Sequence, residues 1–298
     1  MRNEILEGRR GFTMVELCVV VLVVGALCAA LFVLLSGDRR QQRVVKDGTQ
    51  IRGIHQGLVM LASSMDSYAR PSMFDTMGAA VSGPQESKDT TSNIVSLLIF
   101  SGFFKPDICV SPSETNPAIR IDTKYEYSNP KGAVVPAQAH WDPGFSADFT
   151  AVNPARAAGF SYAHLLPFGK RGELKWTNSF SSDDAIISNR GPKVSSATFG
   201  KAPSVVPTFD LKSNTLLIHG GRSTWEGNVV YNDNSVAFET SMASAGKLRS
   251  YFNVGPSKVR GQWHDLLFYE EPEDTEHTDN FLVNVNKIGE HGPELIWD

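Results

Sequence analysis

An uninterrupted apolar run near the amino terminus constrains this chain more than any other feature. Every residue from Leu17 to Leu35 is apolar or glycine, and Met14 and Val15 extend the run past a single acid, Glu16. A helix of about 20 residues matches the thickness of the hydrocarbon core of a bilayer. Buried helices of soluble proteins are shorter or amphipathic. The run therefore predicts a membrane-spanning helix over residues 12–35.

The residues before the run form a short charged leader, residues 1–11. A secretory signal peptide also begins with basic residues, but its apolar region is usually only about 7 to 15 residues long. Leucine precedes both Cys18 and Cys28, which disfavours a lipoprotein site because such a site needs a small residue there. Arginines flank both ends of the run, so charge alone does not settle the membrane orientation.

The junction between leader and span carries a motif. Residues 11–16 are Gly-Phe-Thr-Met-Val-Glu and run directly into the apolar segment. This combination resembles the type IV prepilins and type II secretion pseudopilins. The resemblance implies that a membrane leader peptidase cleaves the chain after Gly11. The same enzyme, acting as an N-methyltransferase, then methylates Phe12. It further implies that Glu16 guides assembly with other pilin or pseudopilin subunits on an inner-membrane assembly platform.

The position of Glu16 points to a partner independently of this motif. A carboxylate inside a span costs a few kcal/mol, so it is expected to be functional or paired. The resemblance implies that the partner is the amino-terminal ammonium of Phe12 in a neighbouring subunit, an attraction that is stronger in a low dielectric than in water. The alternative is that Glu16 reaches the lipid headgroups from near the end of the span.

Beyond the span the pattern becomes amphipathic. Apolar residues recur at helical spacing until Pro71, which disfavours helix in the residue before it. The stripe comprises Ile51, Ile54, Leu58, Leu61, Met65 and Tyr68. We predict that the helix continues over residues 36–70 and packs a head domain.

Two further features belong to this extension. Gly48, Gly53 and Gly57 each weaken a helix by about 1 kcal/mol relative to alanine, which predicts a kink or local melting. A basic face just outside the span has two interpretations: contact with solvent or headgroups, or a subunit contact with the acidic carboxyl-terminal segment. Its residues are Arg39, Arg43 and Lys46.

Residues 71–298 are expected to form an extracytoplasmic head rich in β-structure. Pro71–Asn93 is polar and predicts a loop, and Ile94–Phe100 is a short apolar element. Short apolar runs separated by Pro, Gly and Asn then predict strands. These runs are Tyr125–Tyr127, Phe160–Leu166, Ala185–Ile187 and Leu216–His219. The expected fold class is α+β and type IV pilin-like: a long N-terminal helix, with a membrane-spanning half and an amphipathic half, packed on a mainly antiparallel β head.

The clearest local prediction is a hairpin. Asn228–Tyr231 and Ser235–Glu239 are strand-like and flank Asn-Asp-Asn, residue types that tolerate the positive φ of hairpin turns. Alternation predicts that one face of this hairpin carries four side chains. They are Val229, Tyr231, Val236 and Phe238.

The same region carries a second resemblance. It is similar to the C-terminal signature of pilin-like proteins abundant in planctomycete-type bacteria. The residues that carry this resemblance are His219-Gly220-Gly221, the strand that follows, Asp233 and Ser-Val. That signature has His-x-Gly-Gly, a strand, Asp-Gly and Ser-Val. This chain inserts residues 222–227 between the glycines and the strand, and has Asn234 where glycine is usual.

Several classes of function find no support in the sequence. The net charge of -4 provides too little positive charge for a nonspecific nucleic-acid binder. The histidines lack zinc-ligand spacing, and nucleotide-binding and hydrolase motifs are missing, so we expect neither an enzyme nor a cofactor. His219 is expected to be a hydrogen-bonded residue at a strand end rather than part of a site. Cys109 is the only cysteine of the head and is expected to be a small buried hydrophobe without a disulfide.

The chain ends in an acidic segment, residues 265–298, which holds ten acids and one lysine. Calcium prefers such oxygen ligands. The candidate ligands are Glu273, Asp274, Glu276 and Asp279. Their spacing matches no EF-hand loop, so a solvated acidic loop is the favoured interpretation.

Together these features predict a structural subunit of a type IV pilus or a type II secretion pseudopilus. We expect a single pass through the inner membrane, contact with membrane lipid, and a periplasmic head that in a filament lies at the cell surface. The rival hypothesis is a signal-anchored extracytoplasmic binding module or hydrolase whose aromatic residues bind ligand. Its candidate aromatics are Trp141, Trp176, Trp225 and Trp263.

Overall fold

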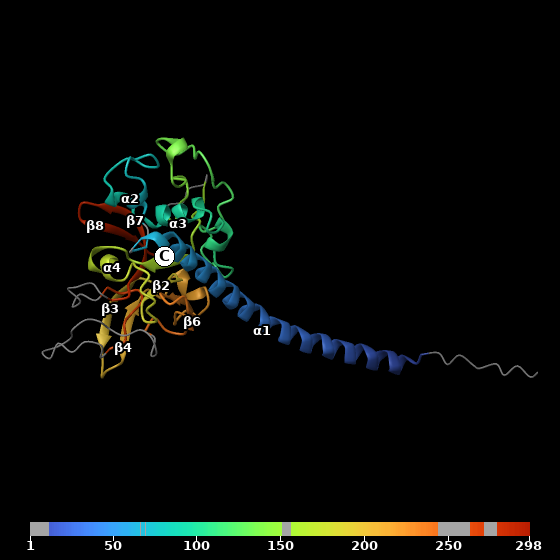
Figure 1. Cartoon of the computed structure of the whole chain (residues 1–298). Coiled ribbons are helices and arrows are strands. Elements are labelled where there is room, and N and C mark those ends of the chain that lie inside the picture. The colour runs from blue at the N-terminus through green and yellow to red at the C-terminus, as the bar shows by residue number, and fades with distance from the viewer. Residues whose placement is uncertain (1–11, 66, 69, 151–155, 244–262, 271–278) are drawn as a thin grey trace, which may run out of the picture. The chain divides into compact units, whose positions relative to one another are not determined.

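A computed structural model describes residues 12–298, apart from residues 66, 69, 151–155, 244–262 and 271–278 (Figure 1). The chain divides into two compact units, one up to Arg43 and one from Val44 to Asp298. The leader, residues 1–11, lies outside the described residues.

The fold is α+β. Its helices are α1 (Met14–Leu61), α2 (Pro71–Phe74), α3 (Thr91–Phe100) and α4 (Gly169–Leu174). Short 3-10 helices are η1 (Ala62–Ser64), η2 (Glu86–Lys88), η3 (Pro106–Cys109), η4 (Pro136–Gln138) and η5 (Asn214–Leu217). The strands are β1 (Tyr162–Leu165), β2 (Ala185–Asn189), β3 (Val194–Phe199), β4 (Val205–Phe209), β5 (Gly227–Tyr231), β6 (Val236–Glu239), β7 (Leu282–Gly289) and β8 (Gly292–Ile296).

The first unit consists of the amino-terminal part of α1. Residues Met14–Leu31 are long and apolar enough to cross a membrane, with a mean hydropathy of 2.7. Every side chain from Phe12 to Leu31 is exposed. Water does not tolerate such a continuous apolar surface, so this part of α1 needs lipid or other helices around it.

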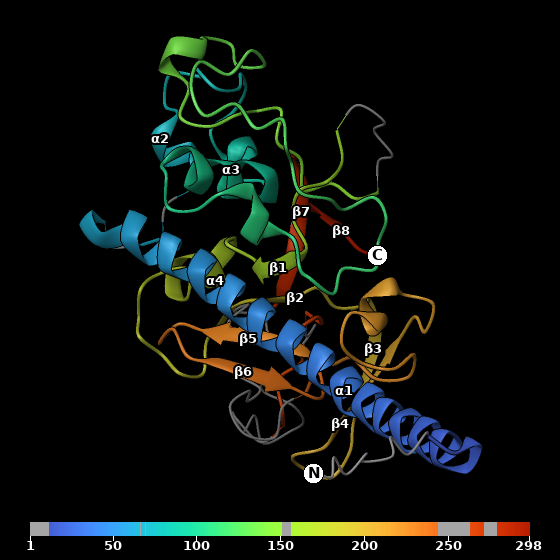
Figure 2. The same cartoon turned by 90° about the vertical axis from the view of Figure 1, so that its right-hand side faces the viewer.

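The second unit is built on a six-stranded sheet in the order β6-β5-β2-β1-β7-β8. Each neighbouring pair is antiparallel, as is the separate two-stranded sheet of β3 and β4. Figure 2 shows α1 crossing in front of β5 and β6. The mainly antiparallel head predicted from the sequence is therefore confirmed.

Two apolar clusters cover the two faces of this sheet. Ile51, Ile54 and Leu58 of α1 pack with residues of α3 and with Val230 of β5. Val229 and Tyr231, the neighbours of Val230, belong to a second cluster on the opposite face. This alternation follows from the two-residue period of a strand.

The hairpin β5–β6 forms as predicted, and Asn234 has the expected positive φ of 63°. The predicted facing of its side chains was wrong. Val230 lies opposite Val236, and Val229 lies opposite Ala237. Because directly opposed residues share a face, Val236 lies on the side of Val230 rather than of Val229.

The predicted end of the first helix was also wrong. The helix stops at Leu61 rather than Arg70, and Met65 is extended, with φ -133° and ψ 154°. Tyr68 is buried without belonging to the helix: its backbone N–H donates to Trp176 O at 2.9 Å, and its ring packs against the ring of Trp176. The tertiary contact outweighs the periodicity here.

Some of the other local predictions are confirmed and others are wrong. β1 lies within Phe160–Leu166, and β2 contains Ala185–Ile187, as expected. Tyr125–Tyr127 is not a strand, and Leu216–His219 overlaps η5 instead. The apolar element after residue 93 is the buried helix α3, which Thr90 caps by accepting a hydrogen bond from Asn93 N.

The predicted weakening at the helix glycines does not break α1, which continues through all three. A Cβ at Gly57 would lie 3.0 Å from Phe104, so the small residue allows close packing against the loop after α3. The free energy lost in helix propensity is offset by this close approach.

A buried hydrogen-bond chain joins α3, β1 and β7. Thr91 Oγ1 accepts from Val285 N at 2.7 Å and therefore donates to His164 Nε2 at 2.8 Å. His164 Nδ1 then donates to Leu165 O at 2.8 Å. Burial lowers the pKa of His164 from 6.5 to about 4, so the ring is neutral near pH 7.

We expect this histidine to make stability fall on acidification. The unfolded chain binds a proton near pH 6.5 and the folded chain only near pH 4, so the stability present above pH 6.5 is lost as pH falls towards 4. The loss should approach about 3 kcal/mol. Denaturant unfolding of wild type and His164→Gln at pH 7 and pH 4.5 measures it. His140→Gln, at an exposed position, is the control. Equal pH dependence in wild type and His164→Gln would contradict the assignment.

Candidate functional site

The start of α1 holds Glu16 in a local hydrogen-bonded ring. Thr13 N and Oγ1 donate to Glu16 Oε2 at 2.8 and 2.9 Å, and Glu16 N donates to Thr13 Oγ1 at 3.3 Å. This is a capping box, which satisfies backbone donors at a helix start. Both bonds to the carboxylate end on Oε2, and Oε1 has no partner among the residues that the structure describes. One acceptor oxygen is thus open to a group from outside.

Phe12 directly precedes this ring and is 75% exposed. The proposed cleavage position, Gly11, lies outside the described residues. Phe12 and Glu16 are four residues apart in the sequence, and both lie at the amino-terminal end of the apolar surface, with Phe12 just before α1.

A second polar site lies on the part of α1 that belongs to the head. Asp47 is fully buried and accepts four hydrogen bonds from side chains. Three of the donors belong to strands β1, β2 and β5, and the fourth lies between η5 and β5. The donors are Tyr162 Oη (2.7 Å), Asn189 Nδ2 (2.7 Å), His219 Nε2 (2.7 Å) and Asn228 Nδ2 (3.3 Å). We call these five residues the Asp47 cluster. A buried carboxylate is tolerated only with such full pairing, so the cluster fixes α1 against the sheet.

About two turns further along α1, His55 contacts the turn of the β5–β6 hairpin. Its Nδ1 lies 3.1 Å from Asn234 Oδ1, and its Nε2 lies 2.9 Å from Tyr68 Oη. Tyr68 Oη donates to Asn232 Oδ1 at 2.8 Å. Burial lowers the pKa of His55, which favours the neutral ring. The hairpin is thus bonded to α1 at both of its ends.

Two glycines allow these contacts. A Cβ at Gly48 would lie 3.1 Å from Asn228 Oδ1 and 3.3 Å from Val236, so a side chain there would push the hairpin away. A Cβ at Gly220 would lie 2.4 Å from Thr224 O, a distance that no side chain can accommodate. Gly221 has open space around its Cβ position.

The residues of the second resemblance therefore have different structural roles. His219 is buried and bonded to Asp47, so the predicted hydrogen bonding is confirmed. The predicted position at a strand end was wrong, because His219 follows η5. Asp233 stays in the turn, where its Oδ1 accepts from Ser235 N at 2.9 Å and from Ser235 Oγ at 2.6 Å. Gly220 permits the tight path after His219. The structure brings His219 and Asn228 together but keeps Asp233 apart from them.

Sequence reasoning missed Asp47, Tyr162 and Asn189. A signal for Asp47 was present, because it precedes Ile51 by four residues and so continues the apolar stripe Ile51, Ile54, Leu58 backwards. A charged residue on a buried helical face needs a partner. Nothing local in the sequence indicates which strands supply that partner.

Those parts of the acidic carboxyl-terminal segment that the structure describes do not form the solvated loop that was predicted, and residues 271–278 lie outside the described residues. Its residues Leu282–Gly289 and Gly292–Ile296 are β7 and β8, and Asp265 and Asp279 are fully buried. Asp279 pairs with the buried Arg171, whose Nε also donates to Asp279 O at 3.0 Å. Burial and the neighbouring Asp279 hold the pKa of Asp265 well above its usual range.

Of the candidate calcium ligands, Glu273, Asp274 and Glu276 lie outside the described residues. Asp279, the fourth, is bonded to Arg171. Within the described part of the chain, no group of three or more His, Cys, Asp or Glu side chains is placed to hold a metal ion.

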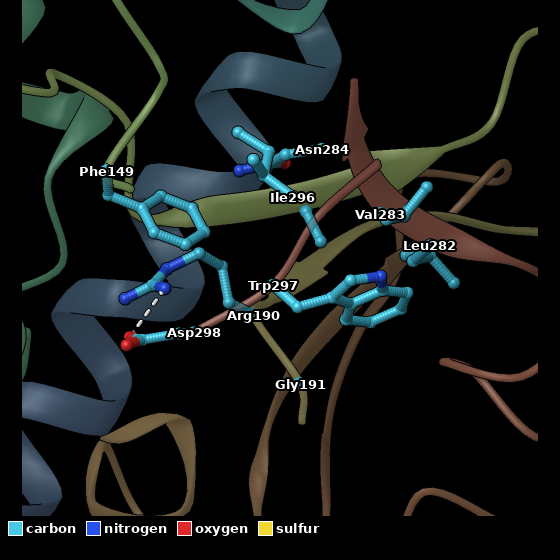
Figure 3. Close-up of a pocket in the computed structure, with 10 residues that line it drawn as sticks. Phe149, Arg190, Gly191, Leu282, Val283, Asn284, Ile296, Trp297 and Asp298 are labelled. Carbon is cyan, nitrogen blue, oxygen red and sulfur yellow. Dashed lines mark hydrogen bonds and ion pairs between the residues drawn. The ribbon is translucent and has the colours of Figure 1, made fainter. Parts of the chain in front are cut away.

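A second buried arginine anchors the last residue of the sequence. Arg190 donates to Asp298 Oδ2 at 2.9 Å and to Glu114 Oε1 at 2.8 Å, and its guanidinium lies 4.4 Å from the centre of the Phe149 ring. Figure 3 shows Arg190, Asp298 and Phe149 around a cavity of about 10 Å³, which Asn284 also lines. This space holds at most one water molecule, so the cavity is not a ligand site.

The aromatic residues of the rival hypothesis do not form a binding surface. Trp141, Trp176 and Trp225 are buried in the apolar clusters, and Trp263 is half-buried, with its Nε1 donating to Gly200 O at 3.0 Å. Cys109 is buried in the core, as expected, and burial raises the pKa of its thiol. Cys18, Cys28 and Cys109 are all free.

Comparisons with known proteins identify no relative: no family model matches the chain, and neither a curated protein nor a solved structure matches it. Function must therefore be inferred from the residues and their geometry.

Proposed function

We propose that this chain is a prepilin-like subunit with a pilin-like fold, cleaved after Gly11, methylated at Phe12 and assembled into a type IV pilus or a type II secretion pseudopilus. In this proposal it crosses the inner membrane once, with its head in the periplasm. Its partners are the leader peptidase, the assembly platform, membrane lipid and other subunits. The observation that carries the proposal is a fully exposed apolar helix with a half-satisfied carboxylate, Glu16, beside its start.

The exposed apolar surface of this helix and the free oxygen of Glu16 would both be satisfied by contact with neighbouring subunits. Packing the apolar surface of residues 12–31 between subunits replaces lipid by close helix contacts. The ammonium that cleavage creates on Phe12 of one subunit then meets Glu16 Oε1 of its neighbour. In a low-dielectric surrounding this pair is strong, and its position sets how far each subunit is shifted along the filament.

We expect Glu16→Ala to leave processing intact and to reduce filament incorporation about tenfold or more, since an unpaired ammonium would remain in the filament core. Gly11→Ala should block processing itself. Mass analysis of the amino terminus and electron microscopy of sheared filaments measure the two steps. Native protein that still begins at Met1 would instead support a signal-anchored module.

The matched control separates pairing from helix capping, because Glu16 also caps α1. Thr13→Val removes the hydroxyl partner within the capping box but keeps the carboxylate, at a cost of about 1 kcal/mol. We expect Thr13→Val subunits to form filaments. Loss of filaments in Thr13→Val and Glu16→Ala alike would reduce the role of Glu16 to capping.

A further inference from the structure

Phe180 has a backbone conformation that large side chains avoid. Its φ is 56°, in the left-handed region, where Cβ crowds the following carbonyl oxygen. Its side chain is 72% exposed, so burial in the core does not compensate for this strain. Backbone strain of this kind clusters at ligand clamps and active sites, which makes Phe180 a candidate binding residue.

Hydrogen bonds from the β5–β6 turn hold the strained loop in place. Asn232 Nδ2 donates to Thr177 O at 2.7 Å, and Asp233 N donates to Ser181 O at 3.2 Å. Because these two bonds lie on opposite sides of Phe180 in the sequence, they fix the backbone that carries its ring.

Phe180 borders a groove of about 390 Å³, a volume within the range of small-ligand sites. The other lining residues come from the last turns of α1, from the loop before Phe180 and from the β5–β6 turn. They are Gln56, Val59, Met60, Asn178 and Asn232–Asn234. Four of these residues carry carboxamide groups, and Asp233 is the one charged residue among them. The groove is therefore mainly polar, with one aromatic ring at its border.

Two of the carboxamides have hydrogen-bonding capacity to spare. Asn178 Oδ1 is buried and accepts no hydrogen bond from the described residues. Gln56 is exposed, and its side chain makes no hydrogen bond to the described residues either. Asn232, by contrast, accepts from Tyr68 Oη and donates to Thr177 O. Because a buried acceptor without a donor destabilises the fold, Asn178 Oδ1 calls for a donor from outside the chain.

We propose that this groove binds a neutral saccharide. A carboxamide donates and accepts hydrogen bonds, as a sugar hydroxyl also does. None of the described lining residues is a cation that would hold an anionic ligand. In the complex, Asn178 Oδ1 accepts the proton of a sugar hydroxyl. The Phe180 ring packs against the C–H face of a sugar ring, whose hydrogens meet the negative face of the aromatic ring.

A peptide fits this groove less well. Extended peptides add to the free edge of a strand, and helical peptides lie in apolar grooves. The described lining comes from a helix, a loop and a turn, includes no residue of a strand, and is mostly polar. Saccharide binding goes beyond the proposed assembly role and does not depend on filament formation.

Calorimetry of the full chain with defined oligosaccharides tests the site. The chain is kept in a detergent without a sugar headgroup, because a maltoside would compete for the groove. Cellotetraose and tetra-N-acetylchitotetraose are the neutral probes, tetragalacturonate is the acidic probe, and tetraglycine is the peptide probe. At least one neutral saccharide should bind with a dissociation constant on the order of 0.1 to 1 mM. Binding of neither neutral saccharide, or equal affinity for tetragalacturonate or tetraglycine, overturns the proposal.

Two substitutions separate binding from folding. Phe180→Gly relieves the left-handed strain, so the melting temperature should stay the same or rise, while affinity for the neutral saccharide should fall about tenfold. Asn178→Ala removes a buried oxygen without a donor, so the melting temperature should not fall, while affinity should fall about fivefold. Leu211→Ala is the matched control, since Leu211 is 56% exposed and lies outside the groove. Unchanged affinity in Phe180→Gly and Asn178→Ala overturns the site, whatever their melting temperatures.

Discussion

Asp47→Ala is expected to destabilise the head by about 4 kcal/mol, a large part of the stability of an ordinary domain. The substitution removes the acceptor of four hydrogen bonds and leaves Tyr162, Asn189, His219 and Asn228 as buried donors without it. Each such group loses its hydration on folding and also loses this hydrogen bond, although Asn228 Nδ2 still donates to Val44 O at 3.0 Å. Denaturant unfolding of the full chain in detergent, followed by tryptophan fluorescence, measures the loss.

Two variants define how this result is to be interpreted. Asp107→Ala removes an exposed carboxylate from η3 and should change stability by less than about 0.5 kcal/mol. Asp47→Asn keeps the shape but turns one acceptor oxygen into a donor, so its effect should be intermediate. An Asp47→Ala protein as stable as Asp107→Ala would show that the cluster does not hold α1 to the sheet.

Arg171→Met is expected to cost about 3 to 5 kcal/mol, because it leaves the fully buried Asp279 without its cation. Methionine fills a similar volume, so loss of packing contributes little. The effect is aggravated by Asp265, a second buried carboxylate that already interacts unfavourably with Asp279. Thermal unfolding at pH 7 measures it.

The matching variants distinguish charge from packing. Lys170→Met changes the exposed neighbour in α4 and should leave stability within about 0.5 kcal/mol of wild type. Adding Asp279→Asn to Arg171→Met removes the buried charge that has lost its arginine and should recover part of the lost stability. If the double variant is less stable than Arg171→Met alone, the loss comes from packing around Arg171 and not from the charge of Asp279.

Local sequence signals predicted those parts of the fold that local physics determines. The apolar run at Leu17–Leu35 needs no other segment to be helical, and the Asn-rich turn of the β5–β6 hairpin needs only its own backbone preferences. The end of α1 and the helical state of α3 could not be predicted in this way. Tyr68 leaves the helix to bond Trp176, and the β-branched residues of α3 are helical because the core surrounds them.

The candidate site residues also differ in how far they could be predicted from local sequence. Phe12 and Glu16 are only four residues apart in the sequence, so their motif was visible, and the short spacing from Thr13 to Glu16 also explains the capping box. Of the residues around Asp47, the sequence singled out only His219 and the strand that begins at Asn228, as parts of the second resemblance. It did not indicate that both contact Asp47. Their common partner is 172 and 181 residues away, and periodicity carries no information about contacts of that range.

This separation imposes an order on biosynthesis. Asp47 leaves the ribosome early, but its partners follow it by 115 residues at Tyr162, by 142 at Asn189 and by 181 at Asn228. Contacts of such long range form slowly. The membrane-proximal helix must therefore wait, with its acid still hydrated and its apolar stripe uncovered, until more than three-quarters of the chain has been made.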